Sequence, residues 1–164
     1  MYKLFLVCLM SIFCFHVNGQ DLNLASIQQE VKLAFPETDF TDKLIVVTVW
    51  NSESASLREM NKEMIRVYNF YKGAKFKDGL KGIIFLSLSS DVNELQHLIC
   101  LKKDFNDFKY SLCDFKGFAT NSILSKININ PTLKNAVFNC KGTLIYQNID
   151  TESIYKSLNA LLTR

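Results

Sequence analysis

Residues that bend or interrupt a polypeptide are scarce: only two prolines and six glycines occur in 164 residues. This scarcity excludes collagen-like, proline-rich and other low-complexity classes. Hydrophobic residues make up 48% and charged residues 21% of the chain, as in an ordinary globular protein. No phosphate-binding glycine loop, dinucleotide fingerprint or G-x-S-x-G motif is present. The net charge of +3 is too small to indicate nucleic-acid binding.

Cysteine and histidine are also scarce, and none of the five cysteines belongs to a C-x-x-C pair. Beyond the N-terminal region lie Cys100, Cys113 and Cys140, an odd number, so at least one thiol has no partner within the molecule. Their isolation favours small buried side chains, and leaves open one disulfide or one reactive thiol. The spacing of Cys, Asp and Glu residues around His97 displays no set of metal ligands, so we expect no metal site. We expect His97 to be a partly exposed helix residue, and we expect no cofactor.

Residues 1–19 have the features of a secretory signal. Lys3 is followed by an apolar run over 4–15 and by small or neutral residues before a cleavage site after Gly19. The run is shorter than the about 20 residues that span a bilayer, which disfavours a membrane anchor. We therefore expect an exported protein, periplasmic or secreted, with no stable membrane span after cleavage.

Hydrophobic periodicity predicts an α/β domain. The continuous apolar runs 44–50 and 82–88 are typical of strands covered on both faces, and 55–71 between them carries one apolar stripe at helical spacing. A strand, a crossover helix and a strand imply parallel pairing. Further helices are expected at 24–35, 118–126 and 151–162, and another from a cap at Ser90 or Asp91 to residue 103. A short extended piece is expected at 110–113, and the strands 133–138 and 143–147 should form an antiparallel hairpin.

The passage from strand to helix carries the most informative order of residues. It reads Trp50, three residues ending in Glu53, the tetrapeptide Ser54-Ala55-Ser56-Leu57, and then Arg58. This order resembles the thioredoxin superfamily, and within it the secreted TlpA- and ResA-like thiol-disulfide oxidoreductases, where a C-x-x-C pair opens the helix. A second similar piece is Asn130-Pro131-Thr132, which precedes the hairpin.

The resemblance implies a thioredoxin-like fold with a central mixed β-sheet and helices on both faces. It covers the domain at 40–164, which follows a helical lead-in at 20–39. Because Asn130–Pro131 matches the family's cis-proline loop, we expect a cis bond that leaves the preceding backbone free for an extended peptide to pair with, against the alternative of an ordinary trans loop proline.

Redox activity is not expected at the matching helix start. Thiol-disulfide exchange needs a thiolate and a second thiol, which Ser54 and Leu57 cannot supply. Ser54 suits a helix cap, and the Glu53 carboxylate is favoured near a helix N-terminus. We therefore expect a binding or accessory module for extended polypeptide or another envelope protein. Its expected cleft comprises Trp50, Glu53, Ser54, Ser56, Leu57, Asn130, Pro131 and Thr132.

An enzymatic alternative stays open at this point. One of Cys113, Cys100 and Cys140 could have taken over as the reactive thiol of a thiol-disulfide oxidoreductase or thiol peroxidase, because distance along the chain does not determine distance in space.

Overall fold

The computed structural model describes residues 22–104 and 109–163, so the predicted signal at 1–19 lies outside the described residues. Five strands form one sheet in the order β3-β2-β1-β4-β5. β1 pairs in parallel with β2, and β2 with β3, whereas β4 is antiparallel to both β1 and β5. The strands span Leu44–Trp50 (β1), Ile83–Ser89 (β2), Tyr110–Leu112 (β3), Asn135–Phe138 (β4) and Leu144–Gln147 (β5).

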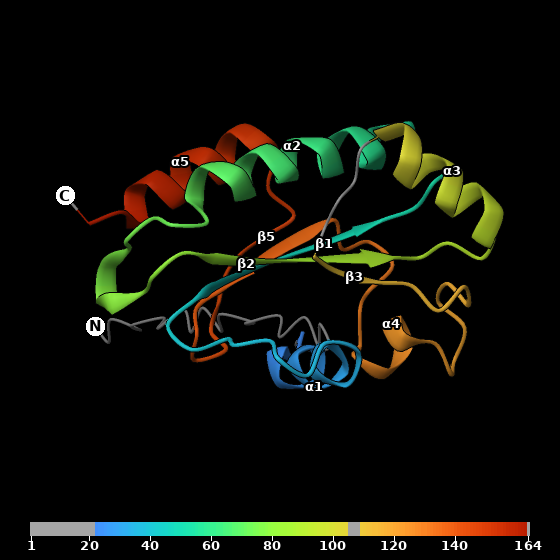
Figure 1. Ribbon diagram of the computed structural model, residues 1–164, viewed down its shortest axis with the longest axis horizontal. Helices are drawn as coiled ribbons and strands as arrows, with labels where there is room; N and C mark the ends of the chain where they lie inside the picture. Colours follow the sequence, from blue (N-terminus) through green and yellow to red (C-terminus); the bar gives the residue numbers. More distant parts are fainter. Residues whose placement is uncertain (1–21, 105–108, 164) are drawn as a thin grey trace, which may run out of the picture.

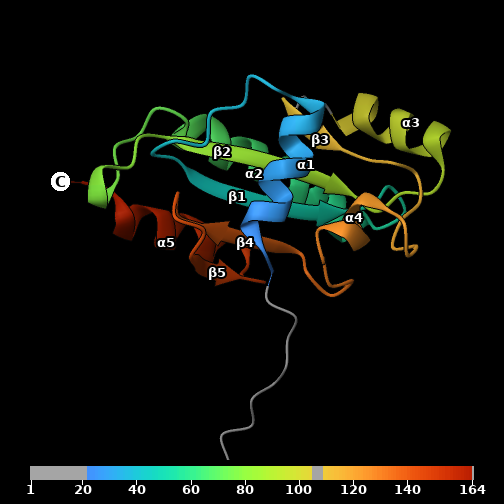
Figure 2. The same ribbon diagram turned by 90° about the horizontal axis from the view of Figure 1, so that it is seen from below.

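Helices cover both faces of this sheet (Figure 1). One layer holds α2 (Ala55–Tyr71), α3 (Glu94–Asp104) and α5 (Thr151–Leu161), and the other holds α1 (Leu24–Ala34) and the short α4 (Ile123–Lys126). Figure 2 shows α1 crossing the strands on its face. The predicted α/β class and the mixed sheet are therefore confirmed. The helix predicted from residue 118 starts later, because Ser122 caps it by accepting a hydrogen bond from the Ser125 amide.

Burial follows from this layering. All seven residues of β1 are buried, because alternate side chains point into two different cores. One core lies against α1 and α4 and includes Ile27, Val47 and Leu124. The other lies against α2 and α5 and includes Val46, Met64 and Leu158.

The pairing determines which loops meet at each edge of the sheet. The three parallel strands end at one edge, and β4 begins there, since Thr48 lies opposite Asn135 and the Val49 amide donates to the Lys134 carbonyl (2.9 Å). We call this the C-terminal edge. The β4–β5 turn lies at the opposite edge, where Phe138 faces Ile45. Over the described parts of the chain, no helix is long and apolar enough to cross a bilayer.

Candidate functional site

Ser54 caps α2 at the C-terminal edge, as its residue type predicts. Its Oγ accepts a hydrogen bond from the Leu57 amide (3.3 Å) and lies 3.2 Å from the Ser56 Oγ. The Ser54 amide donates in turn to the Asn51 side chain (2.8 Å). Glu53 and Ser56 are exposed, and Ser54 and Leu57 are half-buried. The helix start therefore presents hydroxyl groups, one carboxylate and an aliphatic side chain.

Trp50 is a core residue. It is fully buried, its Nε1 donates to the Ser87 Oγ (2.9 Å), and its ring stacks on His97 with centroids 5.2 Å apart. A buried indole with its one donor satisfied has no group left for a ligand. Trp50 supports the floor of the site instead of lining an open cleft.

The prediction of a cis proline is wrong. No cis peptide bond occurs among the described residues, so Asn130–Pro131 is trans. Pro131 occupies the second position of a turn closed by the Leu133 amide and the Asn130 carbonyl (2.9 Å), a position that its fixed φ favours. The Asn130 side chain accepts from the amide and the hydroxyl of Thr132, which tightens the same turn.

This proline turn nevertheless lies at the same edge as the start of α2. Directly after the turn, the Lys134 carbonyl accepts from the Val49 amide. The Lys134 amide donates to the Asn148 side chain (2.8 Å), so both backbone groups of Lys134 are used internally. Asn130, Pro131 and Thr132 are exposed beside them.

A buried polar cluster under the helix start is absent from the sequence-based prediction. The Asp91 carboxylate accepts hydrogen bonds from the Ser52 amide and hydroxyl on one oxygen, each at 2.7 Å. Its other oxygen accepts from the Ser89 hydroxyl and from His97 Nδ1, also at 2.7 Å. Burial alone raises the pKa of Asp91, but the hydrogen bonds to its carboxylate outweigh this effect and hold it at about 2.

Two predictions about this region are corrected here. Asp91 does not cap α3: it points inward, and the Asn93 side chain accepts from the Gln96 amide (3.0 Å) instead. His97 is not partly exposed but buried, between Trp50 and Phe115. The sequence does contain a signal for the burial of His97, because His97, Cys100 and Asp104 recur at helical spacing and form the inward face of α3.

An ion pair fastens α2 to α3. Arg58 binds both carboxylate oxygens of Asp104, at 2.6 and 2.8 Å, and Lys62 lies 3.4 Å from the same carboxylate. The hydrogen bonds from Arg58 are the main cause of the lowered pKa of Asp104. The basic residue after the tetrapeptide is therefore engaged in holding two helices together.

The three described cysteines are all free, which excludes the disulfide alternative for them. Cys100 is buried, with its thiol 3.7 Å from the Ser52 carbonyl. Cys113 is half-buried at the C-terminal edge, and burial raises the pKa of its thiol. Cys140 lies in the β4–β5 turn at the opposite edge, beside the start of α1.

The buried cluster does not form a working nucleophile. The Ser89 hydroxyl donates to Asp91, and both side chains are almost fully buried, as is His97. A serine nucleophile would need its proton directed at the histidine and its oxygen open to substrate. The cluster is therefore a support that fixes the β1–α2 loop.

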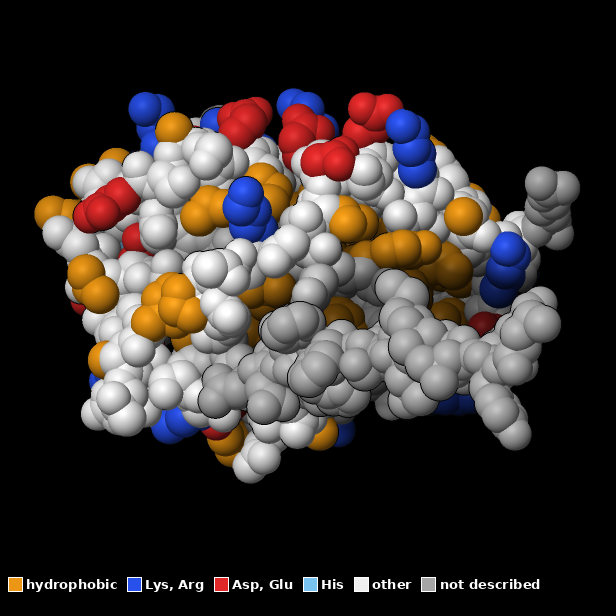
Figure 3. Space-filling model, turned by 180° about the vertical axis from the view of Figure 1, so that it is seen from behind, with side chains coloured by type: hydrophobic (Ala, Val, Ile, Leu, Met, Phe, Trp, Pro, Cys, Tyr) orange, Lys and Arg blue, Asp and Glu red, His pale blue; other side chains and the backbone are white. Residues whose placement is uncertain are grey.

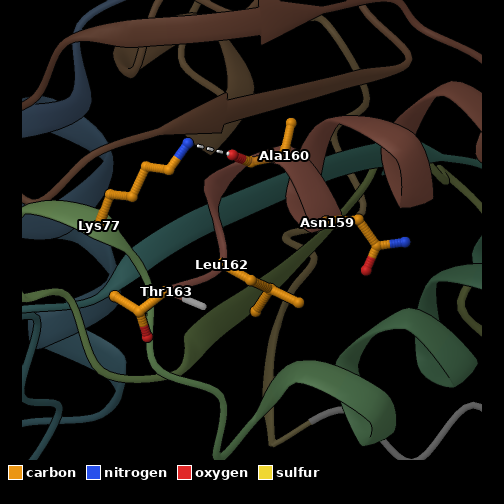
Figure 4. Close-up of a pocket in the computed structure, with 5 residues that line it drawn as sticks. All are labelled: Lys77, Asn159, Ala160, Leu162 and Thr163. Carbon is orange, nitrogen blue, oxygen red and sulfur yellow. Dashed lines mark hydrogen bonds between the residues drawn. The ribbon is translucent and has the colours of Figure 1, made fainter.

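A shallow pocket at the end of α5 lies away from these residues. It is lined by Lys77, Asn159, Ala160, Leu162 and Thr163 (Figure 4). The Lys77 ammonium donates to the Ala160 carbonyl (2.7 Å), as expected of a cation at a helix C-terminus. This contact gives Lys77 a structural role.

The fold class is clear from solved structures. The chain is similar to a C-terminal domain assigned as a thiol-disulfide oxidoreductase from Bacteroides thetaiotaomicron, with 26% identity, a TM-score of 0.60, and coverage of 76% of this chain and 80% of that one. A thiol-disulfide oxidoreductase from Bacteroides fragilis matches at 24% identity and a TM-score of 0.58, over 74% of this chain and 82% of the other.

A secreted disulfide oxidoreductase from Mycobacterium tuberculosis shares the fold at 12% identity and a TM-score of 0.53, covering 74% of this chain and 84% of its own. No protein-family model and no curated protein matches the chain. The fold is therefore thioredoxin-like, of the type found in thiol-disulfide oxidoreductase domains. The activity has to be argued from the residues themselves.

Proposed function

We propose that this chain is an exported thioredoxin-fold domain that has no dithiol redox activity and binds extended polypeptide or another envelope protein. The observation that carries the proposal is the start of α2. There the Ser54 oxygen serves as a helix cap and Leu57 is a half-buried aliphatic side chain. Exchange requires a thiolate and a resolving thiol, and neither residue can provide one.

The other thiols give little support to the enzymatic alternative. Cys100 is only 2% exposed. Cys113 is at the correct edge, but burial raises the pKa of its thiol, and a raised pKa lowers the fraction of nucleophilic thiolate. Cys140 is at the wrong edge for chemistry beside α2.

The proposed binding surface is the rim of the C-terminal edge. Glu53 and Ser56 contribute exposed polar groups from the start of α2, and Asn130, Pro131 and Thr132 contribute an exposed turn. Recognition through these side chains fits the geometry better than strand addition before Pro131, because the Ile129 amide and the Asn130 carbonyl already have partners. Half-buried Leu57 adds an apolar contact between polar ones.

An insulin-reduction assay tests the redox part of the proposal. In the presence of dithiothreitol, the full chain should not accelerate insulin precipitation beyond the rate of the reductant alone. A comparison with Cys113→Ser addresses the alternative directly. Acceleration by the wild type that disappears in this variant would contradict the proposal and favour a single-thiol enzyme.

Binding can be tested with reduced, carboxymethylated α-lactalbumin as an unfolded probe. In NMR titrations, shifts should concentrate at residues 53–57 and 130–132. Leu57→Ser should weaken binding by removing the apolar contact of the rim, whereas Leu144→Ser, at an exposed leucine beside the β4–β5 turn at the opposite edge, should not. Equal effects of the two variants, or shifts spread over other surfaces, would count against the rim. Export is tested by measuring the mass of the protein that accumulates on expression. This mass should correspond to a chain that begins at Gln20.

A further inference from the structure

The helix α3 has its polar and apolar faces reversed. Its inward face buries His97, Cys100 and Asp104, and its outward face exposes Leu95, Leu98 and Ile99 to 69%, 52% and 50%. Val92, just before the helix, is 69% exposed as well. A surface helix normally turns its leucines toward the core. Four large apolar side chains left together in solvent indicate an interaction surface.

This surface continues into a hollow. The residues that line the hollow are Val92, Asn93, Glu94, Leu95 and Leu98. In Figure 3, where the end of the molecule that carries α3 lies at the left edge, hydrophobic side chains protrude from that edge. Val92, Leu95 and Leu98, three of the four exposed apolar residues, therefore line the hollow itself.

Two opposite charges lie at the ends of this outward face, with Leu98 midway between them. Glu94 lies in the first turn and Lys102 in the last, and each is four residues, about one helical turn, from Leu98. If two copies of the helix cross antiparallel with Leu98 on the two-fold axis, Glu94 faces Lys102 of the second copy and Leu95 faces its Leu101. A parallel pair would instead set like charges against each other.

We propose that α3 is the contact of a two-fold symmetric homodimer, with a second copy of this chain packed antiparallel on its outward face. One patch then serves both copies, which is the requirement for a closed two-fold interface. The antiparallel helix dipoles add a favourable contribution. The polar inward face has its own explanation, since His97 and Asp104 bind Asp91 and Arg58 within the same copy.

Sedimentation equilibrium of the full chain tests this dimer. The wild type should be dimeric at micromolar concentration, and Leu98→Glu should weaken self-association by about a hundredfold or more, because it sets two carboxylates together on the axis. Leu33→Glu is the matched control, since Leu33 on α1 is a leucine even more exposed (71%) than Leu98, and it should leave the association unchanged. Circular dichroism of both variants verifies their fold.

A charge-reversal pair tests the antiparallel register. Lys102→Glu should weaken the dimer by about tenfold, and addition of Glu94→Lys in the same chain should restore it, because both interchain pairs reform with exchanged signs. A monomeric wild type would overturn the proposal and leave this face for a different protein. Equal effects of Leu98→Glu and Leu33→Glu, or failure of the double reversal to restore the dimer, would overturn it as well.

Discussion

The Asp91 carboxylate offers a sharp test of how the start of α2 is held in place. It accepts four hydrogen bonds at 2.7 Å while only 5% exposed. In Asp91→Asn, one acceptor oxygen becomes an amide donor, so at least one of these donors loses its partner. Hydrogen bonds to charged groups contribute about 1.5 to 3 kcal/mol, and we expect the variant to lose about 2 to 3 kcal/mol of unfolding free energy at neutral pH.

The pH dependence of the free energy of unfolding distinguishes the effect of the Asp91 charge from the effect of its shape. The folded-state pKa of Asp91 is about 2, against an ordinary value of 3.8. Because the folded pKa is the lower one, its stabilisation is present above about pH 4 and is lost as the pH falls through about 2. A difference of this size corresponds to about 2 kcal/mol. The stability gap between wild type and Asp91→Asn should therefore shrink by that amount between about pH 5 and pH 2.

Urea unfolding followed by the fluorescence of Trp50, the sole tryptophan, provides the assay. The control is Asp78→Asn, which changes an exposed aspartate whose positive φ of 56° asparagine also tolerates. This control should remain close to the wild type throughout. A gap between wild type and Asp91→Asn that stays constant down to pH 2 would refute the assignment of a depressed pKa.

Three further outcomes follow from the structure. Ser54→Ala should lower the free energy of unfolding by about 1 kcal/mol through loss of the helix cap. Ser56→Ala is the control, and an equal loss of stability in both variants would show that Ser54 is not the cap. Asn61 is fully buried, and its Nδ2 has no partner among the described residues, while its Oδ1 accepts from Thr48. Replacing both partners by apolar residues, in Thr48→Val with Asn61→Leu, should therefore raise the melting temperature. A drop of several degrees would contradict this. Under native conditions a thiol reagent should label Cys113 faster as the pH rises and should reach Cys100 only on unfolding, and fast labelling of Cys100 would show that its burial is wrong.

Local patterns predicted much of the fold. β1 and α2 could be placed within a residue or two, because a long apolar run and a long helical stripe each leave little choice of structure. The cap at Ser54 was predictable for the same reason, since its chemistry involves only the next three residues. The mixed sheet was predicted through the resemblance, which depends on two short motifs.

What could not be predicted depends on contacts between distant segments. Asp91 binds Ser52 from 39 positions away, and no periodicity reports that hydrogen bond. His97 was misplaced because it is buried by contacts with Trp50 and Phe115, which belong to other segments of the chain. Pro131 adopts the bond its own turn requires, which the resemblance to a cis-proline loop could not reveal.

The most direct test of the central claim is a gain of function in the double variant Ser54→Cys/Leu57→Cys, compared with the wild type in insulin reduction. These substitutions install a C-x-x-C pair at the start of α2, where the helix dipole favours a thiolate. We expect the variant to form a reversible disulfide between residues 54 and 57 and to accelerate the reaction while the wild type stays inert. A wild type that already reduces insulin as fast as the variant would contradict the account.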